Sequence, residues 1–223
     1  MKDITTVEKE YYEKKYEIYK ENIAYIWRVA EEEIFGDYLK DVGGKTVLEV
    51  GCGNGTAISY LVSNLKISVF NYIGTDISEN AVKQAKEKFS QGVFFTADCT
   101  KIPLPSKSVD IVSCFGVLHH LENPYVGLKE IFRVLNKNGI LLLREPSDDA
   151  FKRGEGESPY EAGLNANELI ESIKINDAKI LSFVGINPKI SFPIRYILER
   201  LNNLTLWKIK TNNRCVDMLG WWR

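Results

Sequence analysis

The 223-residue sequence lacks an excess of charge of either sign, with 29 lysines and arginines against 30 aspartates and glutamates and a formal net charge of −1. This balance gives no general electrostatic reason to expect nucleic acid or an anionic membrane as a partner. The chain also lacks an apolar run near the roughly 20 residues that cross a bilayer. No apolar signal region follows Met1. We therefore expect no membrane span and a cytoplasmic location.

Cysteine and histidine are scarce. The cysteines show no C-x-x-C spacing and are expected to be reduced, mostly buried thiols (Cys52, Cys99, Cys114 and Cys215). The only histidines are adjacent, His119 and His120, and the sequence places no matched acidic cluster beside them. Two histidines alone fall short of a metal ligand set, so we expect no metal site.

The most informative stretch that is present is a short apolar run followed by three glycines, at residues 45–56. Residues 47–50 predict a strand buried on both faces, and Gly51, Gly53 and Gly55 follow before a helical pattern. Glycine permits a positive φ and lets a ligand approach the backbone without meeting a Cβ. The first turn of the following helix offers unpaired N–H groups. The stretch predicts a nucleotide cradle, and the alternative is a glycine turn required only for packing.

The spacing of the glycines separates two kinds of nucleotide site. The dinucleotide fingerprint is G-x-G-x-x-G, whereas this turn is G-x-G-x-G, with Glu49 two residues before the first glycine. A carboxylate at that position would repel a pyrophosphate but attract a cation. The stretch resembles the first motif of the class I S-adenosylmethionine-dependent methyltransferases, whose loop runs beneath the amino-acid part of a sulfonium cofactor without phosphate. The resemblance implies cofactor contacts along the loop, from Glu49, Gly51, Cys52, Gly53, Asn54 and Gly55.

A second acidic residue, Asp76, ends the strand predicted at residues 70–76. It follows the glycine turn by about 20 residues, where an acid can accept hydrogen bonds from both ribose hydroxyls of a nucleoside. Nicotinamide dinucleotide enzymes use the same device, so Asp76 does not discriminate between the two cofactors. The alternative role is a helix N-cap, for which Ser78 is better placed.

The segment 98–110 follows a third predicted strand and resembles a later stretch of the same family. In that family an acid and its neighbours meet the adenine edge, which implies this place for Asp98 and Thr100. Apolar side chains such as Ile77 and Cys99 can sandwich the ring. The alternative for Asp98 is an ordinary turn at the end of a strand.

The fourth predicted strand, residues 109–115, carries the two histidines just beyond its end. Ligands of open parallel sheets sit beyond the carboxyl ends of the strands, so Phe115 and Val117 are assigned to the wall of the cofactor site. His119 can take a proton from an acceptor hydroxyl at neutral pH, and His120 is assigned to substrate contact. The alternative is that one histidine only bonds to backbone.

Glu145 ends the fifth predicted strand, residues 140–146, so its carboxylate is expected to face the same mouth of the sheet. It would orient the acceptor or remove its proton, and the alternative is an ion pair with Arg144 or Arg153. Residues 147–165 are rich in charge, glycine and serine and predict a surface loop. We expect part of this loop to close over the acceptor.

Two segments outside the resemblance carry stripes at helical spacing. Residues 7–35 hold no proline or glycine and predict a helix that packs against the sheet or also forms a lid over the site. As a lid, the helix would contact the substrate through its tyrosines, namely Tyr12, Tyr16 and Tyr19. Residues 185–213 predict an insertion that packs as a peripheral helix, lines an apolar pocket or forms a homodimer face.

Together the patterns predict a Rossmann-like, doubly wound α/β sheet of seven strands, with a helical cap at residues 1–40 and a methyltransferase domain at residues 41–223. The implied reaction moves a methyl group from S-adenosylmethionine to a small-molecule acceptor by in-line displacement and releases S-adenosylhomocysteine. An oxygen acceptor is preferred, because His119 and Glu145 are both candidate bases. The alternatives are a nicotinamide-dependent oxidoreductase and a non-catalytic methyltransferase-like subunit. The absence of an Asn-Pro-Pro-Tyr or Asp-Pro-Pro-Tyr motif disfavours methylation of a flipped base.

Overall fold

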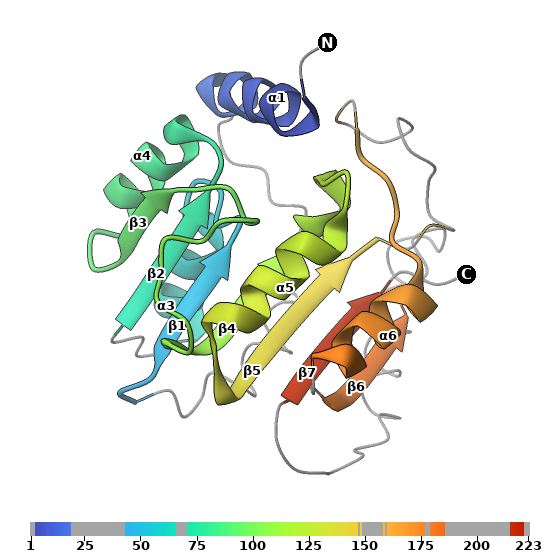
Figure 1. Cartoon of the computed structure of the whole chain (residues 1–223). Helices are drawn as coiled ribbons and strands as arrows, with labels where there is room; N and C mark the ends of the chain where they lie inside the picture. Colours follow the sequence, from blue (N-terminus) through green and yellow to red (C-terminus); the bar gives the residue numbers. More distant parts are fainter. Residues whose placement is uncertain are drawn as a thin grey trace, which may run out of the picture.

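The centre of the molecule is a parallel β-sheet whose strands alternate with helices (Figure 1). The computed structural model of the chain describes residues 3–18, 43–65, 71–146, 148, 158, 160–176, 179–185 and 215–220. Helices in these ranges are α1 (Ile4–Ile18), α3 (Thr56–Leu65), α4 (Glu79–Lys88), α5 (Pro124–Val134), α6 (Ala166–Ile175) and the 3₁₀ helix η1 (Leu118–His120). Strands are β1 (Thr46–Val50), β2 (Asn71–Asp76), β3 (Val93–Thr96), β4 (Val109–Phe115), β5 (Leu135–Glu145), β6 (Lys179–Gly185) and β7 (Cys215–Gly220).

The strands lie in the order β3-β2-β1-β4-β5-β7-β6, and all neighbouring pairs are parallel. At the end of β1, Val50 is level with Thr75 of β2 on one side and with Cys114 of β4 on the other. The strand order reverses between β1 and β4, and ligands of such sheets sit beyond the carboxyl ends of the strands at this point. The expected α/β, Rossmann-like architecture is confirmed, and the glycine turn lies at its ligand-binding edge.

The central strand β1 is buried on both faces of the sheet, as its consecutive residues Val47 and Leu48, which point to opposite sides, show. On β1, Val47 belongs to a core cluster that includes Ile58 of α3. The next residue, Leu48, belongs to a second cluster with Ile131 of α5 and Ile173 of α6. Helices α5 and α6 cover this second face (Figure 1). Burial on two faces is the reason for the continuous apolar run of β1.

Helix starts follow the capping residues of the sequence. Ser78 Oγ accepts the N–H of Ala81 at 3.1 Å and begins α4. Asn123 and Asn165 cap α5 and α6 in the same way, each accepting N–H groups of the first turn. Ser78 is therefore the cap of α4, as expected, and Asp76 serves another purpose.

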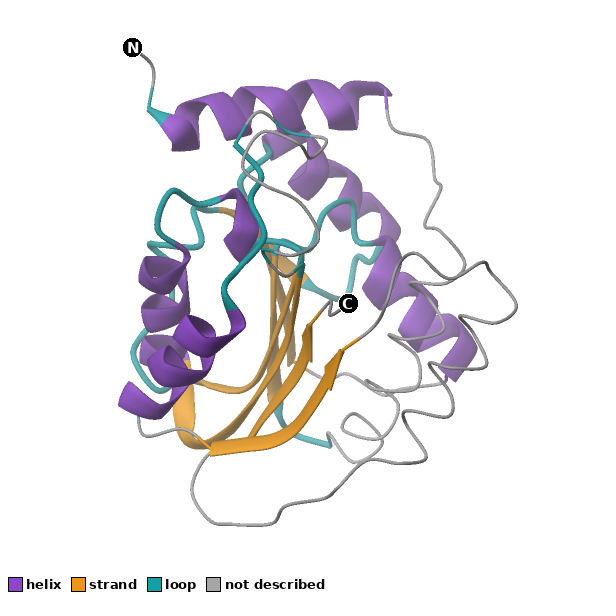
Figure 2. Ribbon diagram, turned by 90° about the vertical axis from the view of Figure 1, so that its right-hand side faces the viewer, coloured by secondary structure: helices purple, strands orange, loops and turns teal. Residues whose placement is uncertain are grey.

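Helix α1 lies across the carboxyl ends of the strands and not on a face of the sheet (Figures 1 and 2). The carboxylate of Glu13 accepts the N–H of Asn80 at 3.1 Å and the hydroxyl of Ser78 at 3.2 Å. Gln84 Nε2 donates to the carbonyl of Tyr16 at 2.6 Å. These contacts fix α1 on the first turns of α4, above the glycine turn.

Some expectations fall on residues that the structure does not describe. Tyr19 and the remainder of the helix expected at residues 7–35 lie outside the described residues beyond Ile18. The same is true of Arg153 and of residues 186–213 of the expected insertion. Within the described ranges, no helix combines the length and apolar character that crossing a membrane would require.

Candidate active site

The glycine turn between β1 and α3 is held by backbone hydrogen bonds to β2. Gly51, Gly53 and Gly55 have φ values of +72°, +52° and +72°, a conformation that other residues rarely adopt. The N–H groups of Gly51 and Cys52 both donate to the carbonyl of Thr75, at 2.7 and 2.9 Å. The turn is therefore a preformed bend fastened to the end of the neighbouring strand.

The three glycines serve two purposes. A Cβ at Gly55 would lie 3.0 Å from Cα of Ala85 in α4, so the packing alternative applies to this glycine. A Cβ at Gly51 would overlap Cγ2 of Val117, and one at Gly53 would lie 2.5 Å from the hydroxyl of Tyr16. These two glycines face the mouth of the sheet, where Val117 and Tyr16 lie against them.

Asp76 joins the end of β2 to this turn. Its Oδ2 accepts the N–H of Gly53 at 2.9 Å, and its Oδ1 accepts the N–H of Ser78 at 3.0 Å. The side chain is only 9% exposed, and burial raises its pKa to about 6. Each carboxylate oxygen can accept two hydrogen bonds, so Asp76 can receive ribose hydroxyls while it holds the turn.

Two other polar residues of the turn are buried, Glu49 and Asn54. Glu49 accepts a hydrogen bond from the hydroxyl of Tyr72. Asn54 Oδ1 accepts from Thr56 Oγ1 at 2.6 Å, but its buried Nδ2 has no hydrogen-bond partner among the described residues. An unpaired buried donor is unusual, and an acceptor group of a ligand, such as the carboxylate of an amino acid, would satisfy it. The turn therefore fits a cofactor with an aminoacyl end.

The turn after β3 holds the residues expected near an adenine. Oδ1 of Asp98 accepts both the N–H and the hydroxyl of Thr100, each at 2.8 Å, which is the strand-end turn of the alternative interpretation. Cys99 packs against the main core cluster, and burial raises the pKa of its thiol, so it is an apolar wall residue and not a nucleophile. Because β2 and β3 are parallel neighbours, this turn lies near the half-buried Ile77.

The side chains at the end of β4 and just beyond it point in different directions. Gly116 has a φ of +66°. Val117 lies against Gly51, as a wall residue of the site would. Phe115 instead packs against the core cluster that includes Val47 and Ile58. The guanidinium of Arg144 lies 5.1 Å from the centre of the Phe115 ring. Phe115 therefore supports the wall from the core side.

Glu145, at the end of β5, anchors the chain that follows β4. Its Oε1 accepts the N–H groups of Val117 and Leu118, at 3.0 and 2.9 Å. Its Oε2 accepts the N–H of His119 at 3.3 Å and lies 2.7 Å from Nδ1 of the same residue. The carboxylate is buried and fully engaged in fixing η1. This arrangement opposes the expectation that Glu145 orients the acceptor or removes its proton.

His119 is held between two carboxylates. Its Nδ1 lies 2.7 Å from Oε2 of Glu145, and its Nε2 lies 2.9 Å from Oε1 of Glu161. Burial alone lowers the pKa of His119, but the hydrogen bonds and charges of the two carboxylates raise it to about 9. The imidazole is then protonated at neutral pH and has no lone pair for a further proton. With both ring nitrogens facing carboxylates, the geometry does not favour a general base here, and that role of His119 stays a prediction.

His120 connects the same tip to α1. Its Nε2 lies 2.9 Å from the hydroxyl of Tyr12, and its Nδ1 lies 3.1 Å from Oγ of Ser158 and 3.2 Å from Oε2 of Glu8. Two tyrosines of α1 thus reach the mouth of the sheet, Tyr12 at His120 and Tyr16 at the glycine turn. Their contact with a substrate stays a prediction, as does that of His120.

The comparisons with known proteins agree with this geometry. Residues 48–143 match the family described as the methyltransferase domain. A probable S-adenosylmethionine-dependent methyltransferase of Mycolicibacterium smegmatis is 28% identical over 163 residues, which cover 72% of this chain and 62% of that protein. The ubiquinone/menaquinone biosynthesis C-methyltransferase UbiE of Campylobacter jejuni is 33% identical over 124 residues, which cover 54% of this chain and 52% of that protein. The matched residues are a class I S-adenosylmethionine-dependent methyltransferase domain.

A solved structure extends the match to the fold of the methyltransferase domain. Magnesium protoporphyrin IX methyltransferase (ChlM) from Synechocystis PCC 6803, with bound SAM, superposes with a TM-score of 0.57 and 18% identity. The superposition covers 79% of this chain and 86% of that chain. The chain spans about half to three-fifths of the length of the curated relatives named above.

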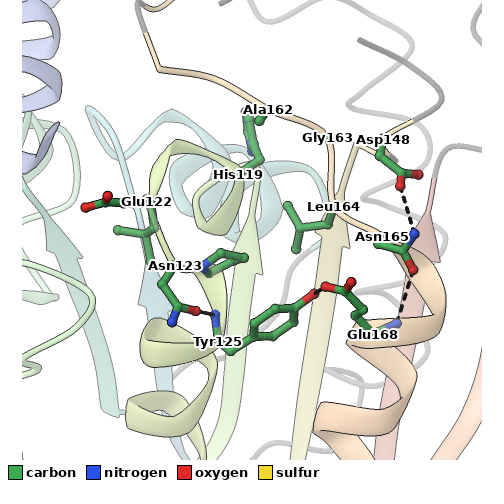
Figure 3. Close-up of a pocket in the computed structure, with 12 residues that line it drawn as sticks. His119, Glu122, Asn123, Tyr125, Asp148, Ala162, Gly163, Leu164, Asn165 and Glu168 are labelled. Carbon is green, nitrogen blue, oxygen red and sulfur yellow. Dashed lines mark hydrogen bonds between the residues drawn. The ribbon is translucent and has the colours of Figure 1, made fainter. Parts of the chain in front are cut away.

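A pocket of about 430 Å³ opens beside His119, between the starts of α5 and α6 (Figure 3). Polar pairs line it: the hydroxyl of Tyr125 donates to Oε2 of Glu168 at 2.7 Å, and Nδ2 of Asn165 donates to Oδ2 of Asp148 at 2.9 Å. Leucines contribute to the same wall. Most of the lining residues are polar or charged, so the pocket would suit a ligand that offers several hydrogen-bonding groups.

The sequence analysis missed three residues that the fold brings to the two histidines, namely Glu8, Ser158 and Glu161. Glu8 comes from α1, and the other two come from the segment that was expected to be a surface loop, part of which closes over the acceptor. No motif or spacing marks them, because they reach the histidines through tertiary contacts alone.

Proposed function

We propose that the chain transfers a methyl group from S-adenosylmethionine to a small-molecule acceptor by in-line displacement and releases S-adenosylhomocysteine. The observation that supports this best is the glycine turn, which Asp76 holds through the N–H of Gly53. Within the described residues the turn leaves Nδ2 of Asn54 unpaired, as a cofactor with a carboxylate would require. The glycine spacing and the acid at Glu49 favour this cofactor over a nicotinamide dinucleotide.

S-adenosylmethionine supplies a methyl group that is already activated by a sulfonium sulfur. The turn with Glu49 and Asn54 would hold its aminoacyl end, and Asp76 would hold its ribose. The remaining contacts that we propose are to the adenine and the site wall, from Ile77, Asp98, Cys99, Thr100 and Val117. Gly55 and Phe115 contribute by packing, because one contacts α4 and the other faces the core.

The chain's own residues align the reactants and exclude water, which together lower the barrier to transfer. Glu145 keeps Val117 and η1 in place through its backbone hydrogen bonds. Tyr16 covers the glycine turn, with its hydroxyl where a Cβ of Gly53 would be. Because Tyr16 lies this close to the turn, we propose that α1 moves as a lid when a cofactor enters.

The proposal includes the division of the chain into a cap at residues 1–40 and a methyltransferase domain at residues 41–223. Strands β6 and β7 would complete a seven-stranded sheet around the insertion at residues 185–213. The positions of Tyr12 and Tyr16 at the mouth support the lid function of the cap. A cytoplasmic location, a homodimer formed through the insertion and the lack of a nucleic-acid partner stay predictions.

The acceptor site that we propose is the pocket beside His119. The preference for a hydroxyl acceptor depended on His119 or Glu145 as a base. Because His119 lies between two carboxylates and Glu145 accepts backbone N–H groups, neither residue is well placed for that role. Thiols, stabilised carbanions and amines depend less on a base, so they are equal candidates.

Calorimetric titration of the full chain with S-adenosylhomocysteine, S-adenosylmethionine and NAD tests the cofactor assignment. We expect affinities in the micromolar range for the first two and no heat with NAD. Heat with NAD alone would instead support an oxidoreductase. Release of S-adenosylhomocysteine with a panel of hydroxyl, thiol, amine and acidic-carbon acceptors tests turnover. Tight binding with no release on any acceptor would favour the non-catalytic alternative.

A further inference from the structure

Four side chains with metal-binding atoms converge at the tip of β4, from three separate parts of the chain. Glu8 comes from α1, His119 and His120 come from η1, and Glu161 comes from the segment before α6. Ligand atoms of the two histidines and of Glu161 all lie within 4.8 Å of one another. Two imidazoles and two carboxylates make a donor set that first-row divalent ions accept.

The residues whose ligand atoms all lie within 4.8 Å of one another are His119, His120 and Glu161, and Glu8 adjoins this group through His120. The spacing within each adjoining pair suits neighbouring ligands on one ion. Two ligand atoms that are each about 2.1 Å from one ion lie about 3.0–3.4 Å apart at ordinary coordination angles. Nε2 of His119 and Oε1 of Glu161 are 2.9 Å apart, and Nδ1 of His120 and Oε2 of Glu8 are 3.2 Å apart. Both distances therefore lie close to those of neighbouring ligands on one ion.

Each of the four side chains is also oriented by a hydrogen bond at its other polar atom, the one that does not face the cluster. Glu145 lies 2.7 Å from Nδ1 of His119, and the hydroxyl of Tyr12 lies 2.9 Å from Nε2 of His120. Backbone N–H groups hold the carboxylates, at 3.0 Å from Ser158 to Oε2 of Glu161 and at 3.1 Å from Tyr160 to Oε1 of Glu8. Such outer partners fix ring orientation and ligand basicity in metal sites.

Glu8 adds an independent observation. Its side chain is 4% exposed, and its Oε2 makes no aligned hydrogen bond within the described residues. The close approach of this oxygen to Nδ1 of His120 is therefore a contact without a shared proton in good geometry. A buried carboxylate oxygen left in this way costs free energy unless a cation or donor meets it.

We propose that Glu8, His119, His120 and Glu161 form a binding site for one divalent transition-metal ion, with Zn²⁺ as the reference ion. The ion would take the place of the proton between Nε2 of His119 and Oε1 of Glu161, so its binding releases a proton to solvent. Since one ligand belongs to α1, the ion would also tie that helix to η1. The proposal does not depend on methyl transfer.

The first test is titration of the chelator-treated full chain with Zn²⁺ and, as a spectroscopic probe, Co²⁺. We expect one ion per chain and at least tenfold weaker binding in each of three single variants, Glu8→Gln, His120→Asn and Glu161→Gln. Glu168→Gln is the matched control, because this carboxylate pairs with the hydroxyl of Tyr125 and lies outside the donor set. Its affinity for the ion should equal that of the unaltered chain.

Several results would overturn the proposal. They are the absence of stoichiometric binding to the unaltered chain, unchanged binding in all three variants, and sulfur-to-cobalt charge-transfer absorption, which would assign the ion to cysteine. Circular dichroism and affinity for S-adenosylhomocysteine verify that each variant is folded. If S-adenosylhomocysteine does not bind even the unaltered chain, the cobalt spectrum still decides the metal site, so the two failures are distinguishable. Hydrogen exchange should also show stronger protection of residues 4–18 with Zn²⁺.

Discussion

The carboxylate of Asp76 accepts the N–H of Gly53, with 2.9 Å between Oδ2 and N, so the end of β2 and the turn after β1 form one unit. The acid proposed to bind the ribose thus also shapes the bend beneath the aminoacyl end of the cofactor. Asp76→Asn replaces one acceptor oxygen with a donor that faces N–H groups. We expect affinity for S-adenosylhomocysteine to fall at least tenfold by calorimetry, about 1.4 kcal/mol or more.

The matched control for this variant is Asp110→Asn. Asp110 Oδ2 accepts the N–H of Thr46 at the same distance, 2.9 Å, but at the opposite ends of β1 and β4 from the site. Loss of this hydrogen bond should lower the free energy of unfolding without changing the affinity for S-adenosylhomocysteine. Equal losses of affinity in both variants would show that Asp76 acts only through the general stability of the sheet.

Burial of Asp76 also predicts a dependence of stability on pH. Its pKa rises from 3.8 to about 6 in the folded chain. Between these two values the carboxyl is ionised in the unfolded chain but still protonated in the folded chain, so the free energy of unfolding falls as pH rises. This contribution to stability is fully present below pH 3.8 and is lost as pH rises through about 6. The loss is on the order of 3 kcal/mol. Urea unfolding should show the stability of Asp76→Asn relative to the unaltered chain increasing by about this amount between pH 4 and pH 7. A difference that does not vary with pH would contradict the raised pKa.

Three glycines form a graded series that separates backbone strain from packing. Gly43 lies in open space without a positive φ, and Gly44 lies in open space with a φ of +77°. Gly55 combines a φ of +72° with a would-be Cβ only 3.0 Å from the backbone of Ala85. Substitution by alanine should cost about 0, about 1 and about 2–4 kcal/mol in that order, from strain alone and then strain plus overpacking. Equal losses at Gly44 and Gly55, measured by urea unfolding, would rule out the packing contribution.

The parts of the site that the sequence predicted are those built by local chemistry. A buried strand, a bend that requires positive φ and a strand-end acid stand close together in the chain, so Gly51, Gly53 and Asp76 could be assigned without a structure. The cap of α4 at Ser78 is another local feature. Each of these depends on residues within one or two elements.

The roles of Glu145 and His119 could not be predicted in the same way. The position of Glu145 at a strand end was correct, but the sequence does not show that the backbone of η1 folds onto its carboxylate. The contacts of Glu8 and Glu161 with the two histidines could not be predicted either, because these acids are distant in sequence from His119 and His120. Acidic partners that arrive through tertiary contacts leave no local signal.

Glu13 is one of the residues that dock α1 on the rest of the chain. Glu13 accepts from Ser78 and Asn80 at the start of α4, where the helix dipole also favours a negative charge. Glu13→Gln should weaken docking by about 0.5–1 kcal/mol and increase hydrogen exchange of residues 4–18 about two- to fivefold. Glu17→Gln, an exposed position on the same helix, is the control and should leave exchange unchanged. Equal exchange in the two variants would contradict the role of Glu13.

Glu145→Gln distinguishes an anchoring carboxylate from a catalytic base. The amide that replaces one oxygen would face the N–H groups of Val117 and Leu118, or the N–H and ring of His119, without a lone pair for them. We expect a loss of about 2–4 kcal/mol in the free energy of unfolding, measured with urea, because buried donors are left unpaired. The exposed Glu168→Gln should cost less than about 0.5 kcal/mol. A catalytic base would give the opposite result: the variant would unfold like the unaltered chain, and only kcat would fall. A variant that keeps its stability but has a lower kcat would therefore support Glu145 as a base in proton transfer. A variant that loses stability would support the role of Glu145 in holding η1.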